Sequence, residues 1–575
     1  MKNTIFKEQI DMAQKFNVFT TENKYLQSEK NIVRKEALGR AIDILTINRD
    51  SSTIATLDYF DEVERFMLKD SSNPNDVLIA NTLSEKDKFA WKKHYKSILG
   101  KKQSDELRVA YLSGPNPEND LNELIELGIL PENVWAFESE NDVYDEAVMN
   151  LLFTYPQMKI HKGKISSFFE NSAIKFDIIY LDFCGTFFSS SKSNKNISTL
   201  ISLLENHRLN SPGSLVTNYA YISDENDPEV KKLIAKVVAL YLYPKAYADF
   251  GGSADEQGYD FYEWYNKVEG NVMNYYSEFI RRFMMDLTAV YVPFIRICKS
   301  EDYFKMFFNA DDKRLELCNR NLFEYRWDDI DNDNREVSFK LEDDYGGHLA
   351  ESMNHYSIPW FIDMSEVKNV NTLYEDEVTN DRSMLKDFFE EFYDERFRKT
   401  TKNMLTQIFQ NNERYKSRFC AMLYMLISSE YGNECYSERL LRVYELDWNI
   451  YSIQACDVFT FQSVAGLLIG QMAVPYHINV NKSLGWQYKA KETIMMTDLF
   501  VLDECRYIYD MMPTIDMLPV RMTDLSPQIC YRFALDALDK NHIRYNPEIF
   551  FGCAVVGVNH EGFEDRWFSE RIIIE

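Results

Sequence analysis

Five short apolar segments between residues 108 and 219 decide the predicted fold of this chain. They are Arg108-Val-Ala-Tyr-Leu112, Asn133-Val-Trp-Ala-Phe-Glu138, Met158-Lys-Ile-His161, Phe176-Asp-Ile-Ile-Tyr-Leu-Asp182 and Ser214-Leu-Val-Thr-Asn-Tyr219. Each is a nearly continuous apolar run, which is typical of a parallel strand that is buried on both faces. Amphipathic segments at residues 119–127 and 142–153 separate the first three runs. The pattern therefore predicts βαβ units and an α/β fold with a doubly wound, mostly parallel sheet.

Helical patterns lie before this sheet. Residues 28–48 and 56–69 carry apolar residues at helical spacing, and Ser84-Glu-Lys-Asp87 is typical of a helix start. After the sheet, the acidic and polar residues 328–344 indicate a linker. We therefore predict three parts: a helical N-terminal extension (1–104), the sheet domain (105–327) and a helix-rich α+β C-terminal domain (345–575).

The sheet is expected to end in an antiparallel hairpin. Ala289–Ile297 and Tyr303–Phe308 are two apolar runs joined by the short polar segment Cys298-Lys-Ser-Glu-Asp302. Two such runs around a short polar loop indicate a β-hairpin. A parallel sheet completed by an antiparallel hairpin is a specific architecture rather than a generic one.

Composition limits the classes of function. The 575 residues carry a formal net charge of −27, which argues against binding nucleic acid across the whole surface, since every phosphate contact needs a local cation. The nine cysteines form no C-x-x-C pair, which predicts reduced thiols and no metal site of the zinc type. No signal-peptide pattern is present, and the longest apolar run, residues 464–474, falls short of the ~20 residues that span a bilayer. We expect a cytoplasmic protein without membrane contact.

Ligands of open parallel sheets bind at the carboxyl ends of the strands. The candidate site residues in these positions are Ser113, Gly114, Asn116, Glu138, Ser139, Lys164, Ile165 and Asp182. With the strand ends aligned, the layout resembles class I S-adenosylmethionine-dependent methyltransferases over residues 105–225 and the predicted hairpin. The resemblance implies a methyltransferase-like sheet with S-adenosylmethionine as cofactor.

The resemblance also implies a role for each strand end. The loop with Ser113, Gly114 and Asn116 would let the backbone approach the methionine part of the cofactor, although this loop has a single glycine. Glu138, followed by Ser139, would accept hydrogen bonds from both ribose hydroxyls. At Lys164, next to Ile165, the family often has an acidic residue that accepts from the adenine amino group, whereas a lysine cannot accept.

Asp182 is the predicted catalytic residue. In the methyltransferases of that family that act on amino groups, an acidic or amide residue at this position accepts a hydrogen bond from the target amine. Cys184 is a further possibility, as a nucleophile like that of cytosine-C5 methyltransferases, but a buried cysteine at a strand end more often only packs.

Two functions remain open at this point. The first is methyl transfer to an amino group of a nucleic-acid base, in RNA or DNA, which a local basic rim would contact. The lysines of that rim are Lys159, Lys162, Lys164, Lys175, Lys192 and Lys195. The second is a methyltransferase-like scaffold or interaction module without catalysis, because function depends on the site rather than on the fold.

Overall fold

The protein is described here by a computed structural model. It describes residues 28–69, 74–183, 185–188, 195–221, 228–249, 261–309, 358, 361–362, 365, 394–427, 437–444, 471–521, 524–531, 533 and 568–575. The predicted linker and two of the residues considered above, Cys184 and Lys192, lie outside the described residues.

The described strands form one mixed sheet that is mostly parallel in its first half. They are β1 (Val109–Leu112), β2 (Val134–Glu138), β3 (Lys159–Lys162), β4 (Phe176–Asp182), β5 (Leu209–Tyr221), β6 (His477–Ile478), β7 (Leu484–Ala490), β8 (Thr493–Asp503) and β9 (Ile572–Ile574). Their order is β3-β2-β1-β4-β5-β8-β7-β9, and β6 pairs with β8. All pairs among β1 to β5 are parallel, which confirms the five predicted strands.

The hairpin predicted at residues 289–308 is wrong. A π-helical turn (Leu287–Tyr291), α14 (Val292–Lys299) and α15 (Glu301–Phe307) occupy this segment instead. Val292, Phe294 and Ile295 are all buried, so this helix is apolar around most of its circumference. In a sequence, a short apolar run of a buried helix cannot be told from a buried strand, because the spacing of apolar residues does not distinguish the two.

An antiparallel hairpin nevertheless extends the parallel strands. It is formed by β7 and β8, and β8 pairs antiparallel with both β5 and β7. The two strands meet in a tight turn at Lys491 and Glu492, where Lys491 has φ = +56°. Two-residue hairpin turns need positive φ because their backbone must match the twist of the strands. The chain thus builds the second half of the sheet from its C-terminal third.

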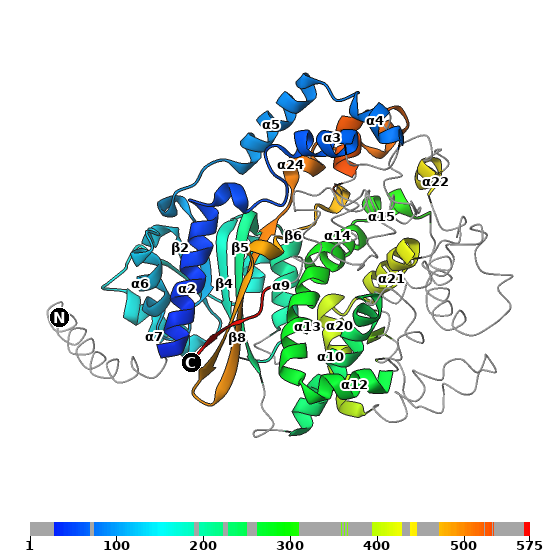
Figure 1. The fold of residues 1–575 in the computed structure, drawn as a ribbon. Helices are drawn as coiled ribbons and strands as arrows, with labels where there is room; N and C mark the ends of the chain where they lie inside the picture. The colour runs from blue at the N-terminus through cyan, green and yellow to red at the C-terminus, as the bar shows by residue number, and fades with distance from the viewer. Residues whose placement is uncertain are drawn as a thin grey trace, which may run out of the picture.

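Helices cover both faces of the sheet, because side chains along each strand alternate between two apolar clusters. In β4, Ile178 and Tyr180 join one cluster, whereas Ile179 and Leu181 join the other. The first cluster contains residues of α2 (Ser28–Leu45), which crosses this face over β4, β5, β7 and β8 (Figure 1). The second contains residues of α8 (Ile165–Asn171) and α9 (Asn196–Glu205). This confirms the α/β fold with a doubly wound sheet.

The remaining described helices pack on the sheet or on one another. They are α3 (Tyr59–Lys69), α4 (Pro74–Ala80), α5 (Glu85–Leu99), α6 (Glu118–Glu126), α7 (Asn141–Leu151), α10 (Pro228–Asp249), α12 (Phe261–Gly270), α13 (Val272–Asp286), α20 (Glu395–Ile408), α21 (Glu413–Ile427), α22 (Glu438–Tyr444), α24 (Arg506–Tyr509) and α25 (Leu518–Arg521). α5 begins with the predicted cap: Ser84 Oγ accepts from the backbone N–H of Asp87, and the Asp87 carboxylate accepts from that of Ser84.

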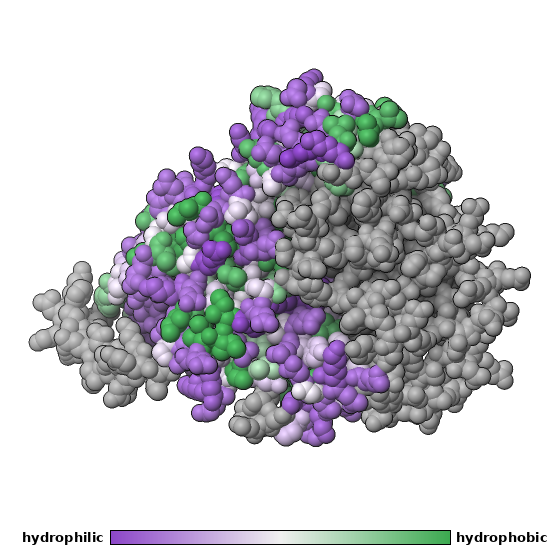
Figure 2. All heavy atoms as spheres, in the orientation of Figure 1, coloured by the Kyte–Doolittle hydropathy of each residue, from purple (hydrophilic) through white to green (hydrophobic). Residues whose placement is uncertain are grey.

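The surface of the described residues is mostly hydrophilic in the view of Figure 2. Apolar side chains gather on it over α4, where Leu78 is 70% exposed, and near the C-terminal strand β9, where Ile573 is 66% exposed. Some exposed apolar side chains are normal on folded proteins.

Candidate functional site

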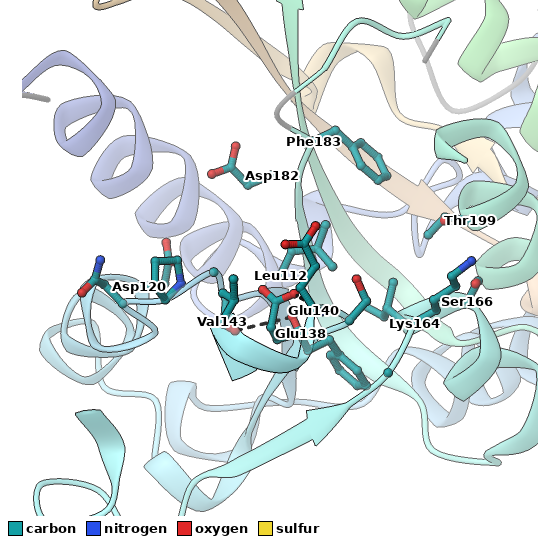
Figure 3. A pocket seen from close by; sticks show the side chains of 18 of the residues that line it. Leu112, Asp120, Glu138, Glu140, Val143, Lys164, Ser166, Asp182, Phe183 and Thr199 are labelled. Carbon is teal, nitrogen blue, oxygen red and sulfur yellow. Dashed lines mark hydrogen bonds between the residues drawn. The ribbon is translucent and has the colours of Figure 1, made fainter. Parts of the chain in front are cut away.

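A cavity of about 530 Å³ lies at the carboxyl ends of β1, β2 and β4 (Figure 3). The residues predicted from the sequence all line it: Ser113, Gly114, Asn116, Glu138, Ser139, Lys164, Ile165 and Asp182. In Figure 3, Asp120 and Lys164 lie on opposite sides of the cavity, with Glu138 between them. The size falls within the range of roughly 300–1,000 Å³ that small-molecule sites occupy.

The loop after β1 is held in place by two side chains. The Tyr111 hydroxyl donates to the carbonyl of Pro117 at 2.6 Å, and Asn150 Nδ2 donates to that of Pro115 at 2.9 Å. Gly114 has φ = +59°, and a Cβ atom there would meet nothing within 4 Å. The backbone conformation, rather than lack of space, therefore favours glycine at this position. The result is a short, fixed loop whose backbone forms one wall of the cavity.

Glu138 ends β2 at the floor of the cavity. Its Oε1 accepts from the backbone N–H of Glu140 at 2.8 Å, and its backbone carbonyl accepts from the N–H of Gly163 at 2.8 Å. The first bond orients the carboxylate, and the second joins the end of β2 to the loop that carries Lys164. A carboxylate offers about four acceptor sites, so Glu138 can accept from hydroxyl groups of a ligand as well.

Asp182 ends β4 within a network of polar side chains. Its Oδ2 lies 2.6 Å from Lys30 Nζ, and its Oδ1 accepts from Asn218 Nδ2 at 2.6 Å. Asn218 is fixed in turn, because its Oδ1 accepts from the Thr497 hydroxyl at 2.9 Å and its Nδ2 lies 3.1 Å from the Tyr488 hydroxyl. Residues of α2, β5, β7 and β8 thus determine the position of this carboxylate.

The surroundings keep Asp182 ionised. Burial acts to raise the pKa of Asp182, but the ion pair with Lys30 and the hydrogen bond from Asn218 lower it by more, so the pKa lies below its ordinary value of 3.8. The pKa of Lys30 is raised: burial acts to lower it, but the charge of Asp182 and the hydrogen bond to Asp182 together outweigh burial. At neutral pH both groups are charged.

Sequence reasoning assigned no role to four charged residues of the cavity: Lys30, Arg34, Asp120 and Glu140. Arg34 Nε lies 2.5 Å from Asp120 Oδ1, and both residues are largely buried. Lys30 and Arg34 stand four residues apart in a predicted helix, so the sequence does indicate that they share a helix face. It does not indicate that this face meets the ends of β1 and β4.

The structure separates the lysines of the predicted basic rim. Lys164 and Lys195 line the cavity. Lys159 donates to a backbone carbonyl and lies over the Trp135 ring, and Lys162 is 3.6 Å from Asp145. Lys175 directly precedes β4, so it lies at the opposite end of that strand from Asp182. Of these residues, two could contact an anion at the cavity.

Comparisons of this chain with protein-family models, with curated proteins and with solved structures find no match. Of the helices in the described ranges, none combines the length and the hydropathy that crossing a membrane requires. Nor do three or more His, Cys, Asp or Glu side chains come together in those ranges as a metal site would need.

Proposed function

We propose that this chain is an S-adenosylmethionine-dependent methyltransferase that acts on an amino group of a nucleic-acid base. One observation carries the proposal. The loop with Gly114, the carboxylate of Glu138 and the carboxylate of Asp182 come from three different strand ends and line one cavity. The resemblance in the sequence assigns these same positions to the methionine part, the ribose and the acceptor amine.

The sheet supports the proposal. Five parallel strands are followed by the antiparallel strand β8 and its hairpin partner β7, which is the architecture that the resemblance implies. In this chain the antiparallel hairpin of the sheet is formed by residues 484–503 rather than by residues 289–308. An open sheet of this kind binds its ligand at the carboxyl ends of the strands, where the cavity lies.

S-adenosylmethionine, when bound, supplies an electrophilic methyl group. The residues of the chain provide position and charge. Asp182 accepts a hydrogen bond from the acceptor amine, which directs the lone pair of the nitrogen and stabilises the positive charge that the nitrogen gains. The low pKa of Asp182 keeps it an acceptor at neutral pH. Glu138 accepts from the ribose hydroxyls.

The proposed acceptor follows from the charges beside the cavity. Lys164 and Lys195 line it, and two cations of this kind can contact the phosphates next to a base that enters the site. The net charge of −27 argues against phosphate contacts across the whole surface, so contacts beside the cavity would be local.

A non-catalytic binding module is the second candidate, and a specific observation favours it. Both oxygens of Asp182 already have partners in the chain, Lys30 and Asn218. In that case the cavity binds a ligand, and the Lys30–Asp182 pair has only a structural role.

Methyl transfer from labelled S-adenosylmethionine to tRNA, DNA and protein pools separates the two candidates. Asp182→Ala should reduce turnover by roughly a hundredfold or more with little change in cofactor affinity, because its contact with the amine strengthens in the transition state. Asp302→Ala, on the distant helix α15, is the matched control and should retain wild-type turnover. Cys184→Ser should have a mild effect.

Each other outcome has a definite meaning. Activity that survives in Asp182→Ala and is lost in Cys184→Ser would indicate that Cys184 acts as a nucleophile and that Asp182 is not the catalytic residue. Cofactor binding without transfer to any pool would favour the binding module. Absence of both binding and transfer would overturn the proposal.

A further inference from the structure

Lys30 contacts the carboxylate to which the proposed function assigns the acceptor amine. Its Nζ lies 2.6 Å from Asp182 Oδ2, while Asp182 Oδ1 accepts from Asn218 Nδ2. An ammonium and an amine are both N–H donors, so Lys30 and an acceptor would compete for the same carboxylate oxygen. The side chains of Lys30 and Asp182 are 19% and 16% exposed, so water screens this ion pair only in part.

The charges of the reaction argue against both nitrogens binding to Asp182 at once. Burial acts to lower the pKa of Lys30, but Asp182 raises it by more, so Lys30 is charged at neutral pH. The acceptor nitrogen gains positive charge as the methyl group is transferred. Two cations on one carboxylate repel each other, and they do so more strongly in a cavity than in water. Asp182 can therefore stabilise the acceptor nitrogen fully only after Lys30 has moved away.

Lys30 can move without unpacking α2. It is the third residue of the helix, and none of residues 28–32 is buried; the buried face of the helix begins at Val33, which is 2% exposed. Further along, Glu36 accepts a hydrogen bond from Trp486 Nε1 at 2.8 Å, which joins the helix to β7. The first turn of a helix also disfavours a cation, because the helix dipole is positive there. Rotation of the flexible lysine side chain is thus enough to release the carboxylate.

We infer that Lys30 makes an autoinhibitory contact: its ammonium occupies Asp182 until an acceptor amine displaces it. The inference rests on the proposed function, because it needs an acceptor amine that binds to Asp182. Asn218 is completely buried and holds the other carboxylate oxygen, so Asp182 keeps its position when Lys30 leaves. The contact also gives the ion pair a role before the acceptor binds, since a buried carboxylate without a cation is costly.

Steady-state methyl transfer to the tRNA or DNA pool that the wild type methylates tests the inference. Lys30→Met removes the ammonium and keeps an unbranched side chain. Its KM for the nucleic acid should fall about tenfold, the lower end of the scale for a hydrogen bond to a charged group, without a decrease in kcat. Lys30→Arg should act in the opposite direction and raise KM roughly threefold or more, because a guanidinium can bind a carboxylate through two parallel hydrogen bonds. A pair with only a structural role would not give opposite changes.

Two controls accompany these variants. Lys35→Met removes a lysine of the same helix that pairs with Glu123 and Glu126 and does not line the cavity, so it should keep the KM and kcat of the wild type. Calorimetry with S-adenosylhomocysteine should give Lys30→Met and Lys30→Arg an affinity within about twofold of the wild type, because the contact restrains the acceptor rather than the cofactor.

An unchanged or higher KM in Lys30→Met would overturn the inference and leave the proposed function intact. Weaker binding of S-adenosylhomocysteine in Lys30→Met would also overturn it, because Lys30 would then act on the cofactor. If Lys30→Met does not fold, Lys30→Arg decides, since it keeps the ion pair; a wild-type KM in that variant would overturn the inference. If the wild type transfers no methyl group to any pool, the proposed function is wrong and this inference with it.

Discussion

Replacement of Glu138 by alanine tests the centre of the cavity. Glu138 lies at the end of β2, and its carboxylate is oriented by the backbone N–H of Glu140 at 2.8 Å. Within the described residues no lysine or arginine forms an ion pair with it, so removal of the carboxylate should leave the fold intact. The measured effect should therefore report ligand binding rather than stability.

The expected magnitude follows from the bonds that are lost. Hydrogen bonds to a charged group contribute about 1.5–3 kcal/mol, so Glu138→Ala should weaken binding of S-adenosylhomocysteine by about 10- to 150-fold. Glu138→Gln keeps one oxygen acceptor without the charge and should give an intermediate loss. The assay is titration calorimetry at 25 °C, with circular dichroism to verify folding.

Glu132→Ala is the matched control, because Glu132 lies before β2, at the other end of the strand from the cavity. It should bind the ligand within about twofold of the wild type. Unchanged affinity in a folded Glu138→Ala protein would refute the ribose-binding role of Glu138. A loss in both variants would indicate a general effect of charge.

Two further predictions concern stability. Gly485→Ala should lower the free energy of unfolding by about 1–3 kcal/mol, because a Cβ atom there would lie 2.1 Å from Nη2 of the buried Arg281, which pairs with Asp498. Gly270→Ala is the control and should be nearly neutral, because a Cβ atom there would meet nothing within 4 Å. Equal thermal midpoints of the two variants would contradict the reasoning. The folded pKa of Asp182 lies below the unfolded value near 3.8, so its ion pair contributes stability above that pH and loses it as the pH falls through the folded pKa. The difference in thermal midpoint between the wild type and Asp182→Asn should therefore persist down to about pH 5 and vanish at lower pH, and a difference that disappears near neutral pH would contradict this.

The parallel strands and the strand-end residues could be predicted from the sequence because their signals are local. A strand that is buried on both faces is a nearly continuous apolar run, as residues 178–181 are, and the first residues after such strands must meet at one edge of the sheet. The cap at Ser84 is equally local, since its partner Asp87 is three residues away. These predictions needed only the spacing of apolar residues along the chain and the chemistry of its turns.

Only the tertiary structure decided which segments complete the sheet and the cavity. Residues 289–298 are mostly apolar because nearly all of them are buried, and the same composition would suit a strand. The antiparallel strand beside β5 comes from residues 493–503, far along the chain, and no local pattern specifies that partner. Lys30 reaches Asp182 for the same reason: a helix face is visible in the sequence, but the strand it packs on depends on how the whole core closes.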